Sequence, residues 1–105
     1  KDRKIMANDG ILVVIINVDM KKRELLIKPN ITTRGFILVN ENEELIHKIE
    51  TKAENSIRTS LQDPKSNFAN LKNDLTENLY PFIYNLTGRK PIILPIILDI
   101  KRETK

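Results

Sequence analysis

The sequence contains no cysteine and only one histidine, His47. Without cysteine the chain has no disulfide, no thiolate nucleophile and no cysteine zinc site, and a reducing cytoplasm is the expected compartment. A zinc-dependent hydrolytic centre needs several imidazoles and carboxylates that converge on the metal, and one imidazole does not supply them. We therefore expect no catalytic residue and no metal ligand in this chain, and we expect His47 on a solvent-exposed helix surface.

Long apolar runs are also missing. The longest, 11–16 and 92–98, fall far short of the ~20 residues that a membrane-spanning helix requires. Residues 1–10 are mostly polar, so no signal peptide is expected, and the sequence has no Gly-rich phosphate loop. With 40% hydrophobic and 30% charged residues, the sequence predicts one soluble domain over 1–105 that has no membrane partner.

Basic residues outnumber acidic ones by 18 to 14, which gives a formal net charge of +4. Because the two signs are mixed along the chain, this excess is by itself a weak argument for a nucleic-acid partner. The candidates for contact with RNA phosphates lie in two groups: Lys21, Lys22 and Arg23, and Arg89 and Lys90. A plain solubilising turn is the alternative for the first group, since the aromatic residues follow core-type patterns rather than an exposed stacking pattern.

Three strands are predicted before the first helix. A turn signal at residues 8–10 precedes the β-branched run 11–18, which is typical of a strand. A charged turn at 19–23 leads to a second strand at 24–27, which completes an antiparallel hairpin and is interrupted by Pro29 and Asn30. Residues 35–39 are predicted to form the third strand.

The apolar period then changes to that of a helix. Apolar residues recur at every fourth position through 45–61, as one stripe of a helix requires. Asn40 and Glu43 resemble a capping box at the start of this helix, and Asp63 and Pro64 end it.

A second helix and a last strand complete the chain. Apolar residues at three- and four-residue spacing through 68–86 predict the helix, in which Pro81 is expected to introduce a kink near Glu77. Gly88 ends it. The last strand is predicted over 92–100, followed by a frayed tail at 101–105, and its proline requires an edge strand or a bulge.

The predicted fold class is α+β, with a three- to four-stranded sheet and two α-helices packed on one face, in the order β-β-β-α-α-β. Two helices cover only one face of such a sheet, yet the first strand is apolar on both faces. One set of alternate residues is Leu12, Val14, Ile16 and Val18, and the other is Ile11, Val13 and Ile15. The last strand repeats this pattern, so something besides the two helices is expected to cover the second face.

An uncovered apolar face favours association, because monomers rarely expose large contiguous apolar patches. The alternative is that the strands twist and residues 1–6 fold over the face. The candidate interface residues are Val14, Ile16, Arg34, Tyr80, Tyr84, Ile93, Ile96 and Leu98. Arg34 is included because a guanidinium at a strand end can anchor a domain by bidentate pairing, with a local salt bridge as the equal alternative.

Two segments of the chain resemble the C-terminal domain of bacterial ribonuclease J. The first is 30–36, Asn-Ile-Thr-Thr-Arg-Gly-Phe, and the second is 82–97, Phe-Ile-Tyr-Asn-Leu-Thr-Gly-Arg-Lys-Pro-Ile-Ile-Leu-Pro-Ile-Ile. Residues 28–30 and 88–90 depart from the usual family pattern in a way that is similar to the more divergent of two paralogues. The resemblance covers nearly the whole chain, and residues 1–9 match the end of the linker through which the family enters this domain.

The resemblance implies a larger parent protein, with a metallo-β-lactamase domain, an inserted β-CASP domain and two zinc ions. That family cleaves RNA as a 5′-to-3′ exonuclease and an endonuclease in RNA processing and mRNA decay. Its C-terminal domain supports assembly and full activity, so the implied partners are the parent's catalytic domains, further copies of the chain or a paralogue, and RNA through the parent. The expected function is an accessory assembly module, with a directly RNA-binding module as the alternative.

Overall fold

The computed structural model describes residues 9–35 and 43–100 of the chain. Its elements are β1 (Ile11–Asp19), β2 (Glu24–Leu25), β3 (Asn30–Arg34), α2 (Glu43–Leu61), α3 (Phe68–Thr87) and β4 (Ile92–Asp99). This order confirms the predicted β-β-β-α-α-β arrangement and the α+β class. The predicted linker and tail, and the helix cap at Asn40, lie outside the described residues, except for Asp9 and Gly10.

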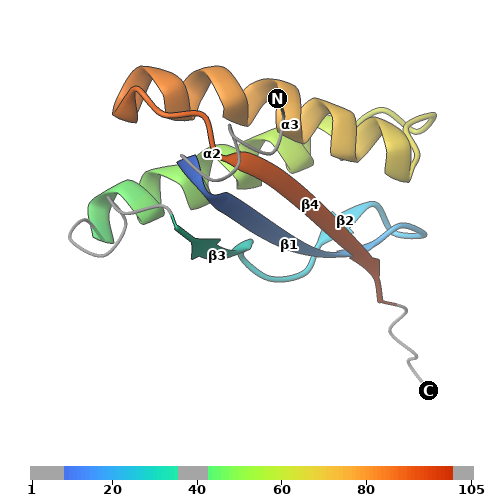
Figure 1. Ribbon diagram of the computed structural model, residues 1–105. Helices are drawn as coiled ribbons and strands as arrows, with labels where there is room; N and C mark the ends of the chain where they lie inside the picture. Colours follow the sequence, from blue (N-terminus) through green and yellow to red (C-terminus); the bar gives the residue numbers. More distant parts are fainter. Residues whose placement is uncertain (1–8, 36–42, 101–105) are drawn as a thin grey trace.

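β1 is the central strand of a mixed four-stranded sheet (Figure 1). On one side it pairs antiparallel with β3, where Ile11 lies opposite Arg34, and with β2, where Val18 lies opposite Leu25. On its other side it pairs parallel with β4, from Ile11 opposite Ile92 to Val18 opposite Asp99. β4 is therefore an edge strand, and the prediction that Pro95 requires such a position is confirmed.

The third described strand includes Asn30, where the sequence pattern indicated a break. The structure has β3 at Asn30–Arg34 and a bend at Gly35, whereas residues 36–39 of the strand predicted at 35–39 lie outside the described residues. The strand begins directly after Pro29 because Ile31 and Thr33 alternate as half-buried residues on the helix side, with exposed polar residues between them. Pairing with β1 thus outweighs the turn tendency of the Pro-Asn pair.

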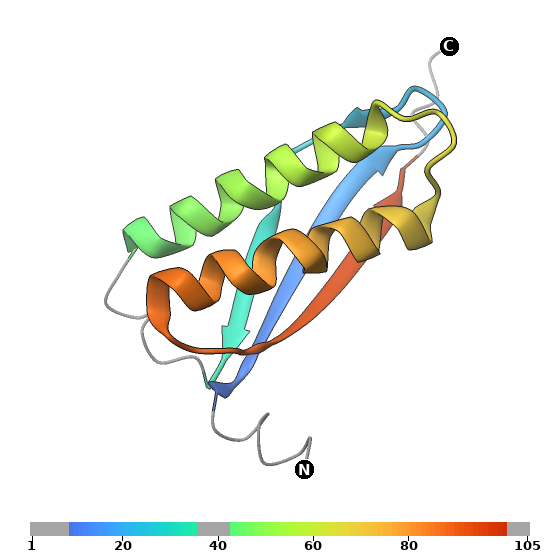
Figure 2. The same ribbon diagram turned by 90° about the horizontal axis from the view of Figure 1, so that it is seen from above.

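Both helices pack on the same face of the sheet (Figures 1 and 2). They cover the even-numbered residues of β1, because successive side chains of a strand point to opposite faces. The buried apolar core consists of Leu12, Val14, Ile16, Val18, Leu45, Ile49, Ala53, Ile57, Leu61, Leu71, Leu75, Leu79, Ile83 and Ile93.

The row of apolar residues predicted for the first helix is confirmed along the whole length of α2. Every fourth residue from Leu45 to Leu61 is buried, and the helix ends two residues before Asp63. Two side-chain hydrogen bonds join α2 to α3 beside this apolar contact: Ser60 Oγ donates to Asp74 Oδ2 at 2.8 Å, and Asn78 Nδ2 donates to Ser56 Oγ at 2.9 Å. Neither of the two described helices is long and apolar enough to cross a membrane.

α3 is capped at both ends. Asn67 is its N-cap and forms a reciprocal capping box with Asn70, with both hydrogen bonds at 3.0 Å. Gly88 ends the helix with a φ of 73° and donates its N–H to the Tyr84 carbonyl, so the predicted stop is confirmed. The helix runs unbroken through Pro81 from Phe68 to Thr87.

Replacing Asn67 by alanine is expected to lower the free energy of unfolding by about 1 kcal/mol, because the side chain satisfies one of the orphan N–H groups of the helix N-terminus. Urea unfolding followed by circular dichroism measures the change. Asn67→Ser is the matched control, since serine is also a good N-cap, and it should retain most of the stability. Equal losses for the two variants would contradict the assigned cap.

Candidate interaction surface

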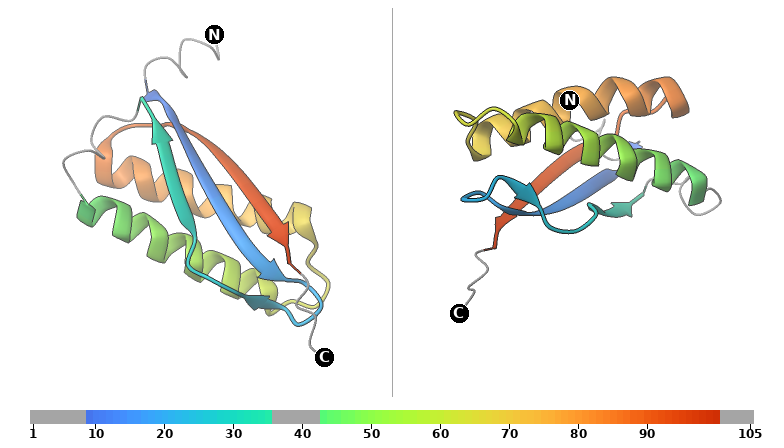
Figure 3. Two further views of the ribbon diagram at one scale, coloured as in Figure 1. Left: turned by 90° about the horizontal axis from the view of Figure 1, so that it is seen from below. Right: turned by 180° about the vertical axis from the view of Figure 1, so that it is seen from behind.

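The sheet face opposite the helices carries a stripe of apolar side chains. We call it the apolar stripe and define it as Ile11, Val13, Ile15, Ile92, Leu94, Ile96 and Leu98. The parallel register of β1 and β4 places Val13 beside Leu94 and Ile15 beside Ile96. On β4 these side chains are well exposed, at 44% for Leu94, 41% for Ile96 and 45% for Leu98. None of the described helices or strands lies over this face (Figure 3).

One side of the apolar stripe is polar. On β3, the exposed residues Asn30, Thr32 and Arg34 lie opposite Ile15, Val13 and Ile11 of β1, and therefore belong to the same face. Within the described ranges no carboxylate forms an ion pair with Arg34. The face thus has an apolar half on β1 and β4 and a polar border on β3.

Three of the predicted interface residues lie on this face. Ile96 and Leu98 belong to the apolar stripe, and Arg34 belongs to the polar border. Tyr84 is exposed as well, but it lies on α3, where Lys90 Nζ is 5.2 Å from the centre of its ring.

Val14, Ile16 and Ile93 are core residues instead of interface residues. The helices cover their side of the sheet, and at most 4% of each residue is exposed. Tyr80 is also turned inward, since its hydroxyl accepts a hydrogen bond from the Ile93 N–H at 3.0 Å and its ring packs against the core. Because β1 is apolar on both faces, the sequence did not distinguish the covered face from the free one.

The two basic groups lie at opposite ends of the sheet. Lys21 and Lys22 are exposed in the turn after β1, whereas Arg89 and Lys90 precede β4. Since β1 and β4 are parallel, the groups are separated by the length of β1, roughly 26 Å for eight residue steps. They do not form one continuous basic surface.

Arg23 joins the β1–β2 turn to the connection between the helices. Its Nε donates to the Leu61 carbonyl at 3.2 Å, and its Nη1 donates to the Ser66 carbonyl at 3.1 Å. Its Nη2 donates to the Asp63 carbonyl and to Ser66 Oγ. The guanidinium therefore satisfies carbonyl groups at and just after the end of α2, and it links the turn to the helical layer.

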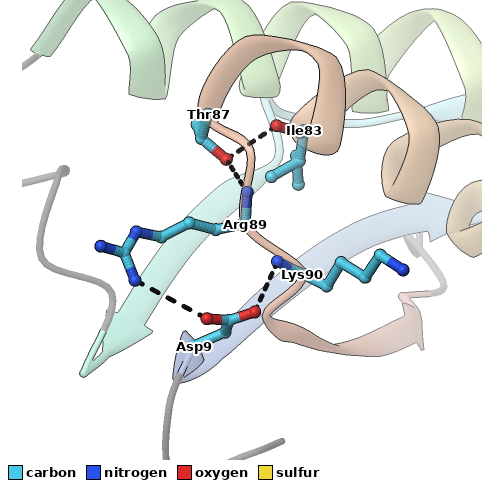
Figure 4. Close-up of polar contacts among 5 residues, drawn as sticks. All are labelled: Asp9, Ile83, Thr87, Arg89 and Lys90. Carbon is cyan, nitrogen blue, oxygen red and sulfur yellow. Dashed lines mark hydrogen bonds and ion pairs between the residues drawn. The ribbon is translucent and has the colours of Figure 1, made fainter.

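Arg89 and Lys90 are tied to the start of β1 through Asp9 (Figure 4). Asp9 Oδ2 accepts the Lys90 N–H at 2.9 Å, and Asp9 Oδ1 lies 3.6 Å from Arg89 Nη1. Thr87 Oγ1 accepts the Arg89 N–H at 3.0 Å and donates to the Ile83 carbonyl at 2.8 Å. The Arg89 charge is therefore partly matched by a carboxylate, a role for Asp9 that its turn signal in the sequence did not indicate.

The described residues do not fit a metal centre. No group of three or more histidine and acidic side chains in 9–35 and 43–100 lies close enough together to hold a metal ion. His47 is on the exposed surface of α2, as predicted, with its Nδ1 3.9 Å from Glu50 Oε1.

A sequence model of the ribonuclease J C-terminal domain matches residues 1–100. The chain belongs to this family. The resemblance seen in the two signature segments is thereby confirmed.

Three named relatives show how much of a longer protein the match covers. Ribonuclease J2 of Bacillus subtilis is 35% identical over 100 residues, ribonuclease J 2 of Staphylococcus epidermidis 31%, and ribonuclease J 2 of Staphylococcus aureus 30%. Each match covers 95% of this chain and 18% of the relative. The ribonuclease J C-terminal domain thus accounts for about a fifth of these proteins.

Proposed function

We propose that this ribonuclease J C-terminal domain is an accessory assembly module, which joins copies of its parent protein through the apolar stripe. The parent is proposed to be a zinc-dependent ribonuclease of the cytoplasm, with exonuclease and endonuclease activity on RNA. In the proposed parent, the two zinc ions and the catalytic residues lie in separate catalytic domains.

The exposed apolar stripe is the observation that carries this proposal. Its side chains lie next to one another on two paired strands, and burial of such surface stabilises an interface by roughly 25 cal/mol per Å² before the losses of association are subtracted. A second copy of this chain fits the pattern, because a two-fold axis that runs parallel to the sheet, just outside its free face, brings the two stripes together. The polar borders on β3 then remain in contact with water, as the rim of an interface requires.

Replacing Ile96 by aspartate is expected to weaken self-association of the chain at least tenfold. The charge would be desolvated in the middle of the buried stripe, whereas in the separate chain Ile96 is exposed enough to accept it. Sedimentation equilibrium over a range of concentrations measures the association constant. Val14→Asp is unsuitable for this purpose because it places a carboxylate in the core.

Leu86→Asp is the matched control, because Leu86 is 43% exposed, close to the 41% of Ile96, but lies on α3 outside the stripe. It should leave the association constant within about a factor of two. The proposed role would be refuted by two results together: the chain stays monomeric at all concentrations, and Ile96→Asp does not change the assembly of the parent protein. Loss of contact between this domain and the catalytic domains, with self-association intact, would assign the stripe to those domains.

Direct RNA binding through Lys21, Lys22 and Lys90 is the competing function. It is weakened by the separation of the basic groups and by the partners of Arg23 and Arg89. Titration of the chain with labelled single-stranded RNA at two salt concentrations compares the two, since phosphate contacts make the affinity fall steeply with salt. Tight, strongly salt-dependent binding would favour the RNA-binding module.

A further inference from the structure

β4 has an open edge on the side that faces away from β1. An edge strand usually presents a row of unpaired N–H and C=O groups, onto which another chain can add as a further strand. Such addition is a second way for this domain to associate, distinct from contact through the apolar stripe.

The hydrogen bonds at the two ends of β4 show which residues face the open edge. The Ile92 N–H donates to the Gly10 carbonyl at 2.9 Å, and the Ile100 N–H donates to the Val18 carbonyl at 2.8 Å. In a parallel pair alternate residues bond to the same neighbour, so the even-numbered residues of β4 turn their backbone groups toward β1. Ile93, Pro95, Ile97 and Asp99 turn theirs toward the open edge.

The first half of this edge has no free N–H group. The Ile93 N–H is occupied, because it donates to the Tyr80 hydroxyl of α3 at 3.0 Å. Pro95 has no N–H at all. Only Ile97 and Asp99 remain as edge donors, and the exposed Asp99 carboxylate beside them accepts the Met20 N–H at 3.1 Å.

The opposite edge of the sheet offers little more room for pairing. It is divided between β2, of two residues, and β3, of five residues, with Pro29 between them. Of the described residues of β3, only Ile31 and Thr33 turn their N–H groups away from β1.

We propose that Tyr80 and Pro95 together close the β4 edge to strand addition, so that a partner binds this domain through side chains on the sheet face and not through backbone pairing. The closed edge prevents open-ended growth of the sheet from one copy to the next, which an apolar parallel sheet otherwise favours. This inference rests on the proposed function only where it assigns the partner to the sheet face with the apolar stripe. The closure of the β4 edge depends on α3 and β4 alone.

The first test measures amide hydrogen exchange in the chain with Tyr80→Phe. Exchange of the Ile93 amide is expected to accelerate at least tenfold, because its acceptor is removed. The Ile92 amide is the internal control, since it donates to the Gly10 carbonyl on the other side of the strand and should change less than twofold. Parallel acceleration of both amides, or no change at Ile93, would overturn the role assigned to Tyr80. This readout requires no association, so it is independent of the assembly proposal.

The second test opens the β4 edge in a chain that carries Ile96→Asp, so that association through the apolar stripe is already weakened. Tyr80→Phe and Pro95→Val are combined in the Ile96→Asp background, and sedimentation velocity follows the mass at rising concentration. The triple variant is expected to form concentration-dependent species larger than a dimer, whereas the Ile96→Asp chain does not. A folded triple variant that sediments like the Ile96→Asp chain would contradict the closure. Should Ile96→Asp itself fail to reduce association, the assembly proposal falls while the exchange result still stands.

Discussion

Replacement of Gly10 by alanine is expected to lower the free energy of unfolding by about 3 kcal/mol, a large effect for the addition of one methyl group. Gly10 has a φ of 87°, a left-handed conformation that costs other residues about 1–2 kcal/mol. A Cβ atom at this position would also lie 2.5 Å from the Arg34 carbonyl oxygen and 2.6 Å from the Gly35 carbonyl carbon. Both neighbours are backbone atoms, so the ends of β1 and β3 would have to move apart.

Gly88→Ala is the matched control for this substitution. Gly88 has a similar φ of 73°, but apart from Gly88 itself and its two chain neighbours no residue has an atom within 4 Å of the position that a methyl group would take there. Gly88→Ala is therefore expected to lower the free energy of unfolding only by the backbone cost of the left-handed conformation, about 1 kcal/mol. Urea unfolding of the two variants measures the difference, and equal losses would show that the close approach of Gly10 to β3 contributes nothing. The approach also fixes Arg34 beside Ile11, at the border of the apolar stripe.

Arg23→Ala is expected to lower the free energy of unfolding by about 2–3 kcal/mol, the second large effect, because hydrogen bonds from a charged donor contribute more than neutral ones. The substitution leaves the carbonyls of Leu61 and Ser66 without the donor that they have in the folded chain. Thermal and urea unfolding measure the loss. An unchanged stability together with a weakened affinity for RNA would return Arg23 to the RNA-contact group that the sequence suggested.

Arg23→Gly separates the side chain from the backbone. Arg23 has a φ of 58°, the only positive φ of a non-glycine residue within 9–35 and 43–100. Glycine relieves the backbone cost while it removes the same hydrogen bonds, so Arg23→Gly should be about 1 kcal/mol more stable than Arg23→Ala. Identical stabilities would mean that the turn is not strained.

The helices and the first and last strands in sequence were predictable because local chemistry determines them. Asp63 and Pro64 follow the end of α2, and Gly88 ends α3, each through a backbone preference that few residue types meet. The alternation of apolar residues in β1 likewise identified the strand. These signals depend on near neighbours in sequence, which is why they could be recognised without the fold.

The free face of the sheet could be anticipated, but its residues could not. The prediction of an uncovered apolar face followed from the excess of apolar residues on β1 over what two helices can cover. Packing between distant segments decides whether the helices cover the even-numbered or the odd-numbered residues of β1, and both sets are apolar. The candidate set therefore included Val14 and Ile16 from the core and omitted Val13 and Leu94 from the stripe. The hydrogen-bond partners of Arg23 could not be anticipated for a related reason, since they lie about 40 residues further along the chain.

The parallel pairing of β1 with β4 has a consequence for the synthesis of the domain. These are the first and last of the described strands, and they pair from Ile11 to Val18. A nascent chain that has left the ribosome only as far as α3 exposes the backbone groups of β1 that β4 will occupy. The sheet is complete only when the last strand has emerged, so a chain truncated before Ile92 exposes one edge of β1, the kind of surface on which incomplete chains aggregate.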